Sequence, residues 1–164
     1  MPSLLGKNNK KRIAIIGGGV SGVAAALSFP SSFLVDIYER EDRLLKKLLK
    51  TGNGKANIFN LNIKPTSYNN PDFIKLHPDM IEKTQTFYRD LGILTYVDEE
   101  GRGYPFSRSA KALAATLVSS LGKNVNVHLS TNVSHIEIKE NGISINGQCY
   151  DYLIITTGSS VYNQ

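Results

Sequence analysis

The chain has 164 residues, a formal net charge of +5 and 41% hydrophobic residues. That length suits one domain, and that apolar share excludes a disordered segment. The sequence has no apolar run near the roughly 18 residues of a membrane-spanning helix, so we expect no membrane association. Cys149 is the only cysteine, which excludes an internal disulfide and favours a cytoplasmic location.

The positive charges do not form the pattern of a nucleic-acid-binding surface. Such proteins cluster Lys and Arg, whereas here "KNNKKR" lies in a polar stretch and "RLLKKLLK" is interrupted by leucines. Nucleic acid is therefore unfavoured as a partner, and attraction to an anionic cofactor explains the charge at least as well. We expect a flexible tail at residues 1–11 and one domain at residues 12–164.

The first elements predict a βαβ unit. An unbroken apolar run predicts a buried strand at 12–16, and residues 20–29 predict a short helix that Pro30 ends. A second strand is expected at 33–39. Because a strand, a helix and a strand follow within so few residues, the two strands are expected to be parallel.

The segment 40–70 mixes charged residues, glycine and asparagine. Its stretch "TGNGKANIFNLN" is predicted to have no regular structure, because Gly52 and Gly54 flank an asparagine and favour positive φ. A loop of this length in a compact domain is usually functional or disordered. A helix follows, opened by Asn70 and interrupted near Pro78.

The rest of the chain predicts short strands around one helix. "LTYVDEEGRGYPFS" predicts a strand or hairpin, 109–121 a helix and "VNVHL" another strand. Two Asn-Gly pairs, at 141–142 and 146–147, predict a meander of three short strands, and a final strand is expected at 152–156. Together these elements predict an α/β fold whose sheet is mostly parallel, with a small antiparallel three-stranded meander.

The first candidate site is the glycine turn "GGGVSG", between a predicted strand and a predicted helix. Gly17 permits the tight turn, Gly19 lets a pyrophosphate approach the backbone, and Gly22 allows the helix to pack against the strand. The helix N-terminus offers N–H groups and a positive dipole end to the anion. The alternative is a tight turn without a ligand, but the strand–turn–helix context favours a dinucleotide.

An acidic residue ends the second predicted strand, where the dinucleotide fingerprint expects one. Glu39 would accept hydrogen bonds from a ribose hydroxyl and would repel a 2′-phosphate, which disfavours NADP. The alternative is a strand-end glutamate that faces water. Arg40 lies against the adenosine or faces solvent, and the sequence leaves both open.

Two further segments are weaker candidates. Lys47 and the loop "TGNGKAN" can wrap phosphates and polar flavin edges with backbone N–H groups, or form a plain solvent loop. The strand end at Thr157 and Gly158 can bring backbone close to a cofactor at the carboxyl edge of the sheet. No metal site suggests itself, and no residue is assigned a catalytic role.

With these motifs the chain resembles the N-terminal part of the BaiN-like, aminoacetone-oxidase-type, FAD-dependent oxidoreductases. Four segments carry the resemblance, in the family's order: "IAIIGGGVSGVAAAL", "YEREDRLLKKLLKTGNGKANIFN", "GRGYPFSRSAKALAATL" and "DYLIITTG". It implies a Rossmann-like FAD-binding domain, redox chemistry at the flavin and NAD(P)H as a candidate reductant. The residues that it implies for FAD binding are Gly17, Gly19, Val20, Ser21, Gly22, Glu39, Arg40, Lys47, Asn53, Gly54, Lys55, Asn57, Val133, Thr157 and Gly158.

The chain departs from the family pattern at four positions. Leu45 stands where the family usually has glycine, Ala56 where it has cysteine, Phe59 where it has a small hydroxyl residue, and Ser159 where a second glycine follows. A Cβ at position 45 is expected to force positive-φ strain or to block close approach. Family members are considerably longer, so we expect a chain that is incomplete relative to the family and lacks the part that shapes the substrate pocket.

Three functions stay open at this point. The chain is the FAD-binding part of a flavin-dependent oxidoreductase, or a truncated dinucleotide-binding fragment without turnover that holds FAD or NAD, or an RNA-associated protein. The small-molecule substrate is unknown. A parallel sheet that lacks a flanking strand exposes an edge, so self-association is also expected.

Overall fold

The computed structural model describes residues 10–158 except 68 and 141, and its contacts divide the chain into two compact units. The first unit comprises Met1–Lys46 and Leu121–Gln164, and the second comprises Lys47–Ser120. Most of the tail expected at 1–11 lies outside the described residues. Within its described end, the Lys11 ammonium pairs with Asp151 at 2.7 Å.

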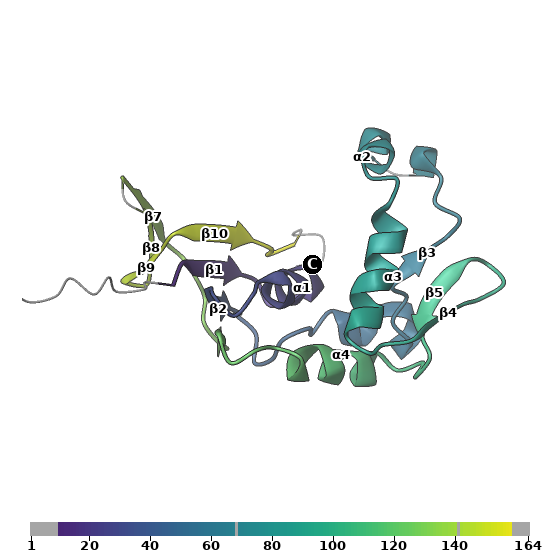
Figure 1. Ribbon diagram of the computed structural model, residues 1–164, viewed down its shortest axis with the longest axis horizontal. Helices are drawn as coiled ribbons and strands as arrows, with labels where there is room; N and C mark the ends of the chain where they lie inside the picture. Colours follow the sequence, from purple (N-terminus) through teal and green to yellow (C-terminus); the bar gives the residue numbers. More distant parts are fainter. Residues whose placement is uncertain (1–9, 68, 141, 159–164) are drawn as a thin grey trace, which may run out of the picture. The chain divides into compact units, whose positions relative to one another are not determined.

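The first unit is built on a four-stranded parallel sheet (Figure 1). Its strands are β1 (Arg12–Ile16), β2 (Leu34–Tyr38), β6 (Val125–His128) and β10 (Tyr152–Ile155), in the order β10-β1-β2-β6. Helix α1 (Val20–Ser28) connects β1 to β2. The predicted βαβ unit and the predominantly parallel sheet are therefore confirmed.

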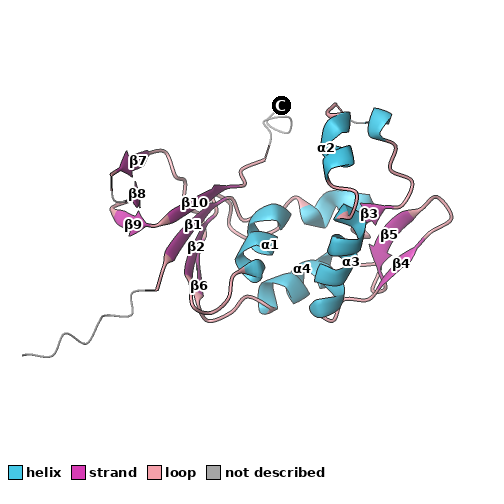
Figure 2. Ribbon diagram, turned by 45° about the horizontal axis from the view of Figure 1, so that its top comes forward, coloured by secondary structure: helices cyan, strands magenta, loops and turns pink. Residues whose placement is uncertain are grey.

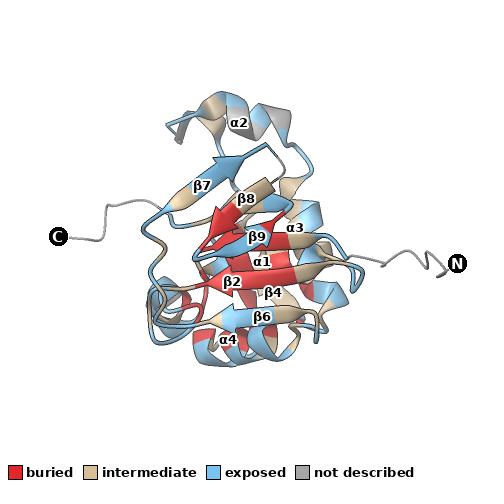
Figure 3. Ribbon diagram, turned by 90° about the vertical axis from the view of Figure 1, so that its left-hand side faces the viewer, coloured by how far each residue is buried: buried red, intermediate tan, exposed pale blue. Residues whose placement is uncertain are grey.

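The two central strands are buried on both faces. On one face, Ile13, Ile15, Val35 and Ile37 have no exposed surface, and on the other, Ala14 is fully buried and Asp36 is 3% exposed. Figure 2 shows α1 on one side of the sheet and strands β7, β8 and β9 on the other. The outer strand β6 is more exposed than β2 (Figure 3).

The predicted antiparallel meander is confirmed as β7 (Ile136–Lys139), β8 (Gly142–Ile145) and β9 (Gln148–Tyr150). Its second turn is the Asn-Gly pair at 146–147, with φ of 50° and 79°, as a two-residue hairpin with two left-handed residues requires. Asn141, in the first turn, lies outside the described residues.

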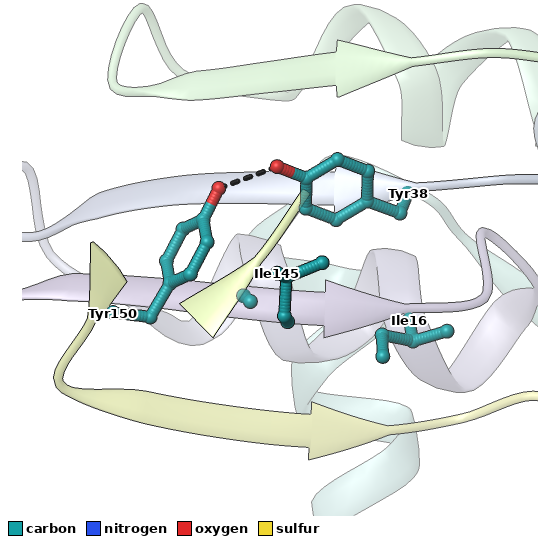
Figure 4. Close-up of a cluster of buried hydrophobic side chains, with 5 residues drawn as sticks. Ile16, Tyr38, Ile145 and Tyr150 are labelled. Carbon is teal, nitrogen blue, oxygen red and sulfur yellow. Dashed lines mark hydrogen bonds between the residues drawn. The ribbon is translucent and has the colours of Figure 1, made fainter. Parts of the chain in front are cut away.

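The meander covers one face of the sheet through a small apolar cluster. Ile145 of β8 and Tyr150 of β9 pack against Ile16 and Tyr38 of the sheet (Figure 4). The hydroxyl groups of Tyr38 and Tyr150 lie 2.6 Å apart, so the polar ends of both rings are satisfied inside this contact.

The second unit contains an antiparallel sheet and most of the helices. Strands β3 (Phe59–Asn60), β5 (Arg102–Pro105) and β4 (Thr95–Val97) lie in that order. The predicted hairpin is β4 with β5. The remaining elements are η1 (Leu48–Gly54), η2 (Pro65–Ser67), α2 (Pro71–Leu76), α3 (Met80–Asp90) and α4 (Ala110–Ser119).

The helix expected after Asn70 is interrupted near Pro78, as predicted, and gives α2 and α3. Ser109 begins α4, because its side-chain oxygen accepts a hydrogen bond from the Ala112 N–H at 3.1 Å. Over the part of the chain that the structure describes, no helix has the length and apolar character needed to cross a membrane.

The prediction that "TGNGKANIFNLN" has no regular structure is wrong. The 3₁₀ helix η1 covers its start, because Leu48 is buried and its carbonyl accepts a hydrogen bond from the Thr51 hydroxyl at 2.7 Å. Phe59 then pairs with Gly103 in the sheet, and its ring occupies the space that a Cβ at Gly103 would need. Positive φ occurs at Asn53 and Gly54, where η1 ends, and again at Ala56.

Candidate functional site

The turn between β1 and α1 contains two glycines that the packing of the chain itself requires. Gly17 has a φ of 105°, and a Cβ there would lie 2.5 Å from the carbonyl oxygen of Thr156. A Cβ at Gly22 would overlap the carbonyl oxygen of Gly17. Both positions exclude any side chain because backbone atoms, which cannot yield, occupy the space.

Gly19 differs from these two glycines. Its backbone is extended, with φ of −72° and ψ of −174°, which any residue can adopt, and among the described residues, apart from its two chain neighbours, no atom lies within 4 Å of a Cβ built there. It begins α1 without a side-chain cap, next to the exposed Val20 and Ser21. The first N–H groups of a helix have no partner within the helix and favour an anion. A side chain at Gly19 would fill the space that a pyrophosphate needs, so the turn fits a dinucleotide.

The peptide groups of the turn are held by neighbouring segments of the first unit. The N–H of Gly17 donates to the carbonyl of Tyr38 at 2.8 Å, and the N–H of Gly18 donates to Oε2 of Glu39 at 2.7 Å. The Gly18 carbonyl accepts from the N–H of Leu45 at 2.8 Å. These bonds shape the turn without a ligand.

Glu39 follows β2 and is half-buried. One of its oxygens accepts from Gly18 N–H, and the other accepts from Glu41 N–H at 2.9 Å. A carboxylate offers about four lone-pair sites, so both oxygens keep capacity for ribose hydroxyls. Arg40 is exposed, and its Nε lies 3.6 Å from a carboxylate oxygen of Glu41.

The departure at Leu45 has the structural effect expected of it. Leu45 has a φ of 60° and is 1% exposed. The preceding Leu44 occupies the space that a Cβ at Gly18 would need. Leu44 therefore packs against the turn, and Leu45 has a strained backbone conformation beside it. Ala56 also has a positive φ, of 61°, and Ser159 lies outside the described residues.

The remaining predicted residues fall into both units. Val133 belongs to the first unit, and its half-buried side chain packs against the apolar cluster under the meander. Thr157 and Gly158 follow β10 and are exposed. The exposed loop residues belong to the second unit and not to the unit that holds the glycine turn; they are Lys47, Asn53, Gly54, Lys55 and Asn57.

Thr156 is a contact residue of the turn that the sequence analysis missed. Its hydroxyl lies 2.8 Å from the carbonyl oxygen of Gly17 and 3.1 Å from that of Ile16. The available signal was a hydroxyl-bearing residue at the end of the final strand. The contact of Thr156 with the turn depends on the register of β10 against β1, which the sequence alone does not determine.

A buried carboxylate lies on the meander side of the same sheet. Asp36 is 3% exposed and accepts hydrogen bonds from Arg12 at 3.1 Å, Asn126 at 3.2 Å and His128 at 2.9 Å. Burial raises the pKa of Asp36, but the hydrogen bonds outweigh it and leave the pKa below its usual range. Among the described residues, no three His, Cys, Asp or Glu side chains group as metal ligands do. The hydrogen bonds of Asp36 link β2 to its two neighbours, β1 and β6.

The parallel sheet, the glycine turn and the acid after β2 define a Rossmann-type dinucleotide-binding protein. The family model described as "HI0933-like protein Rossmann domain" matches residues 11–164. The chain belongs to this family of FAD-dependent oxidoreductases, and the resemblance to BaiN-like flavoproteins is confirmed.

A curated relative is the 3-dehydro-bile acid delta(4,6)-reductase of Clostridium scindens, which is 31% identical over 159 residues. The alignment covers 90% of this chain and 39% of that protein, so the chain spans well under half of its relative's length.

Solved structures support the fold alone. THI4 of Thermovibrio ammonificans has a TM-score of 0.50 at 15% identity, over 82% of this chain and 45% of THI4. The L-proline dehydrogenase of P. horikoshii has a TM-score of 0.51 at 16% identity, over 90% of this chain and 23% of that chain. Both likenesses agree with the Rossmann-like α/β fold.

Proposed function

We propose that this chain is the FAD-binding part of a flavin-dependent oxidoreductase. The observation that carries the proposal is the free space at Gly19. Among the described residues, nothing beyond its chain neighbours lies near a Cβ built at Gly19, whereas a Cβ at Gly17 or Gly22 would collide with backbone atoms. At the N-terminus of a helix, the absence of a side chain would let an anion approach the backbone N–H groups. Membership of a family of FAD-dependent oxidoreductases supports FAD as the cofactor.

The residues of the first unit would hold the adenosine and pyrophosphate end of FAD. The turn would present backbone N–H groups to the pyrophosphate, and Glu39 would accept hydrogen bonds from ribose hydroxyls, with Arg40 beside it. Val133, Thr157 and Gly158 would contribute backbone. Bound FAD supplies hydride or electron transfer at the flavin ring. The family resemblance also predicts contacts of FAD with Lys47, Asn53, Gly54, Lys55 and Asn57.

A nicotinamide reductant and a reducible small-molecule substrate complete the proposal. The relative from Clostridium scindens is a reductase, which supports this direction of electron flow. The substrate itself stays unassigned. A cytoplasmic location is consistent with the single, exposed Cys149.

The second candidate function is dinucleotide binding without turnover, with FAD or NAD as the ligand. The glycine turn and Glu39 favour it, because the adenosine and pyrophosphate that they would hold are common to FAD and NAD. The adenosine site in the first unit would then keep affinity while no substrate is converted.

Calorimetric titration of the chain with FAD, ADP, NAD and NADP tests these functions. We expect FAD and ADP to bind and NADP to bind least, because Glu39 repels a 2′-phosphate. The Gly19→Ala variant should bind FAD at least tenfold more weakly while its urea unfolding curve stays close to that of the wild type. Binding of NAD without FAD would replace the flavin by a nicotinamide site, and unchanged FAD affinity in Gly19→Ala would contradict the assigned turn.

Self-association through the edge of the parallel sheet is a separate proposal. Strand β10 lies at that edge, and its Tyr152 and Ile155 are 52% and 62% exposed. An exposed edge with apolar side chains can pair with a second copy. Size-exclusion chromatography with light scattering tests this, and a monomer at high concentration would refute it.

A further inference from the structure

We propose that Thr156 is the positioning residue of the pyrophosphate turn. The inference deepens the proposed function and rests on it. Thr156 directly follows β10 and is half-buried. The glycine fingerprint assigns it no role, because it lies 139 residues after Gly17 along the chain.

The hydroxyl of Thr156 serves one acceptor. It carries a single proton, and the Gly17 carbonyl oxygen at 2.8 Å is nearer than the Ile16 oxygen at 3.1 Å. The Ile16 oxygen already accepts the backbone N–H of Thr156 at 2.8 Å. The hydroxyl proton therefore goes to Gly17.

Thr156 and Glu39 then hold opposite ends of one peptide group. The carbonyl of Gly17 and the N–H of Gly18 belong to the same plane, and a peptide plane rotates as a unit. Thr156 donates to its oxygen at 2.8 Å, and Glu39 accepts from its nitrogen at 2.7 Å. Rotation of the plane would break both bonds, so its orientation is fixed by the residues that follow β10 and β2.

The Gly17 oxygen depends on this donor. Gly22 packs against both partners of this bond, because a Cβ there would overlap the Gly17 oxygen and lie 2.8 Å from the Thr156 hydroxyl oxygen. A partly buried carbonyl that loses its donor is costly when no other donor replaces it. Without the hydroxyl, the plane would turn to find a new donor, Gly18 N–H would leave Glu39, and the backbone next to Gly19 would move.

The experiment compares Thr156→Val and Thr156→Ala, which remove the hydroxyl, with Thr156→Ser, which keeps it. The matched control is Thr84→Val, which loses an equivalent bond of 2.7 Å to the Met80 carbonyl inside α3 of the second unit. Affinities for FAD and ADP are measured by calorimetry well below the unfolding temperature of each variant. Phosphorus NMR of bound ADP reports the environment of the pyrophosphate.

We expect Thr156→Val and Thr156→Ala to weaken FAD and ADP binding by the same factor, about threefold to tenfold, the equivalent of one hydrogen bond. The phosphorus shifts of bound ADP should move in both. Thr156→Ser should restore affinity and shifts, and Thr84→Val should leave both unchanged. The alanine variant decides the question if the valine variant does not fold.

Two failures are distinguishable. If the wild type binds neither FAD nor ADP, the proposed function fails. If the wild type binds both and the hydroxyl-free variants bind equally well with unmoved phosphorus shifts, the role of Thr156 is refuted while the FAD site stands. A loss of stability in Thr156→Ala without a loss of affinity would likewise refute positioning, because it would assign the hydroxyl to folding alone.

Discussion

The α-carbon of Gly22 lies directly against the carbonyl oxygen of Gly17, with no room for a methyl group between them. This contact sets how closely α1 approaches the end of β1. The helix start therefore sits where its free N–H groups line the turn. The three glycines of the motif thus differ. Gly17 and Gly22 allow close packing of backbone atoms, whereas Gly19 leaves free space at the start of α1.

Gly22→Ala is expected to lower the free energy of unfolding by about 1–3 kcal/mol, because overpacking outweighs the better helix propensity of alanine. Gly19→Ala is the control and should change it by less than about 0.5 kcal/mol. Urea unfolding followed by circular dichroism measures both. Equal losses in the two variants would contradict the assignment of separate roles.

At position 45, we expect glycine to destabilise the protein less than alanine does. Both Leu45→Ala and Leu45→Gly should cost about 2–5 kcal/mol, because a buried leucine side chain is lost. The φ of 60° remains strained for alanine and is free for glycine, so Leu45→Gly should be more stable than Leu45→Ala by about 1 kcal/mol. Chemical denaturation of the pair checks this order, and the reverse order would show that the turn relaxes when the side chain is lost.

Periodicity and the glycine motif predicted the parallel βαβ unit, the meander and the turn, because each depends on contacts near in sequence. Positive φ at Leu45 was anticipated only because the family pattern has glycine there. The side-chain contacts of Glu39 and Thr156 with the turn were not predictable. They depend on the register of three strands, which local sequence does not encode.

The short 3₁₀ helix η1 escaped prediction for a related reason. Its glycines and asparagine favour a loop by propensity, but the burial of Leu48 and the bond from Thr51 override that preference. The division into two units, with residues 47–120 as the second, depends on contacts that are distant in the sequence.

The buried Asp36 predicts a loss of stability in acid. Its pKa is lower in the folded state than in the unfolded state, so its contribution is complete above the unfolded value of about 3.9 and is lost as the pH falls further. Asp36→Asn should be less stable than the wild type by about 1.5–3 kcal/mol at pH 7, and this gap should close below about pH 4. Urea midpoints from pH 7 to pH 3 measure it. The exposed Asp42→Asn is the control, and a gap independent of pH would contradict an ionised Asp36.

The paired hydroxyl groups of Tyr38 and Tyr150 predict an energetic coupling across the meander (Figure 4). Each single change to phenylalanine leaves a buried hydroxyl without its partner, whereas the double change removes both. A double-mutant cycle should therefore give a coupling of about 0.5–1.5 kcal/mol. Additive losses would mean that other partners, such as Asp36 for Tyr150, satisfy each hydroxyl separately.

The pairing of β10 with β1 has a consequence for the order in which the protein folds. The bond from Thr156 to Gly17 closes a loop of 139 residues, and such distant contacts form late because the chain entropy lost in closing the loop must be overcome first. The glycine motif is synthesised well before β10, so its backbone lacks the contact with Thr156 until β10 has emerged. During synthesis, the glycine sequence is therefore present long before the turn can take its final conformation.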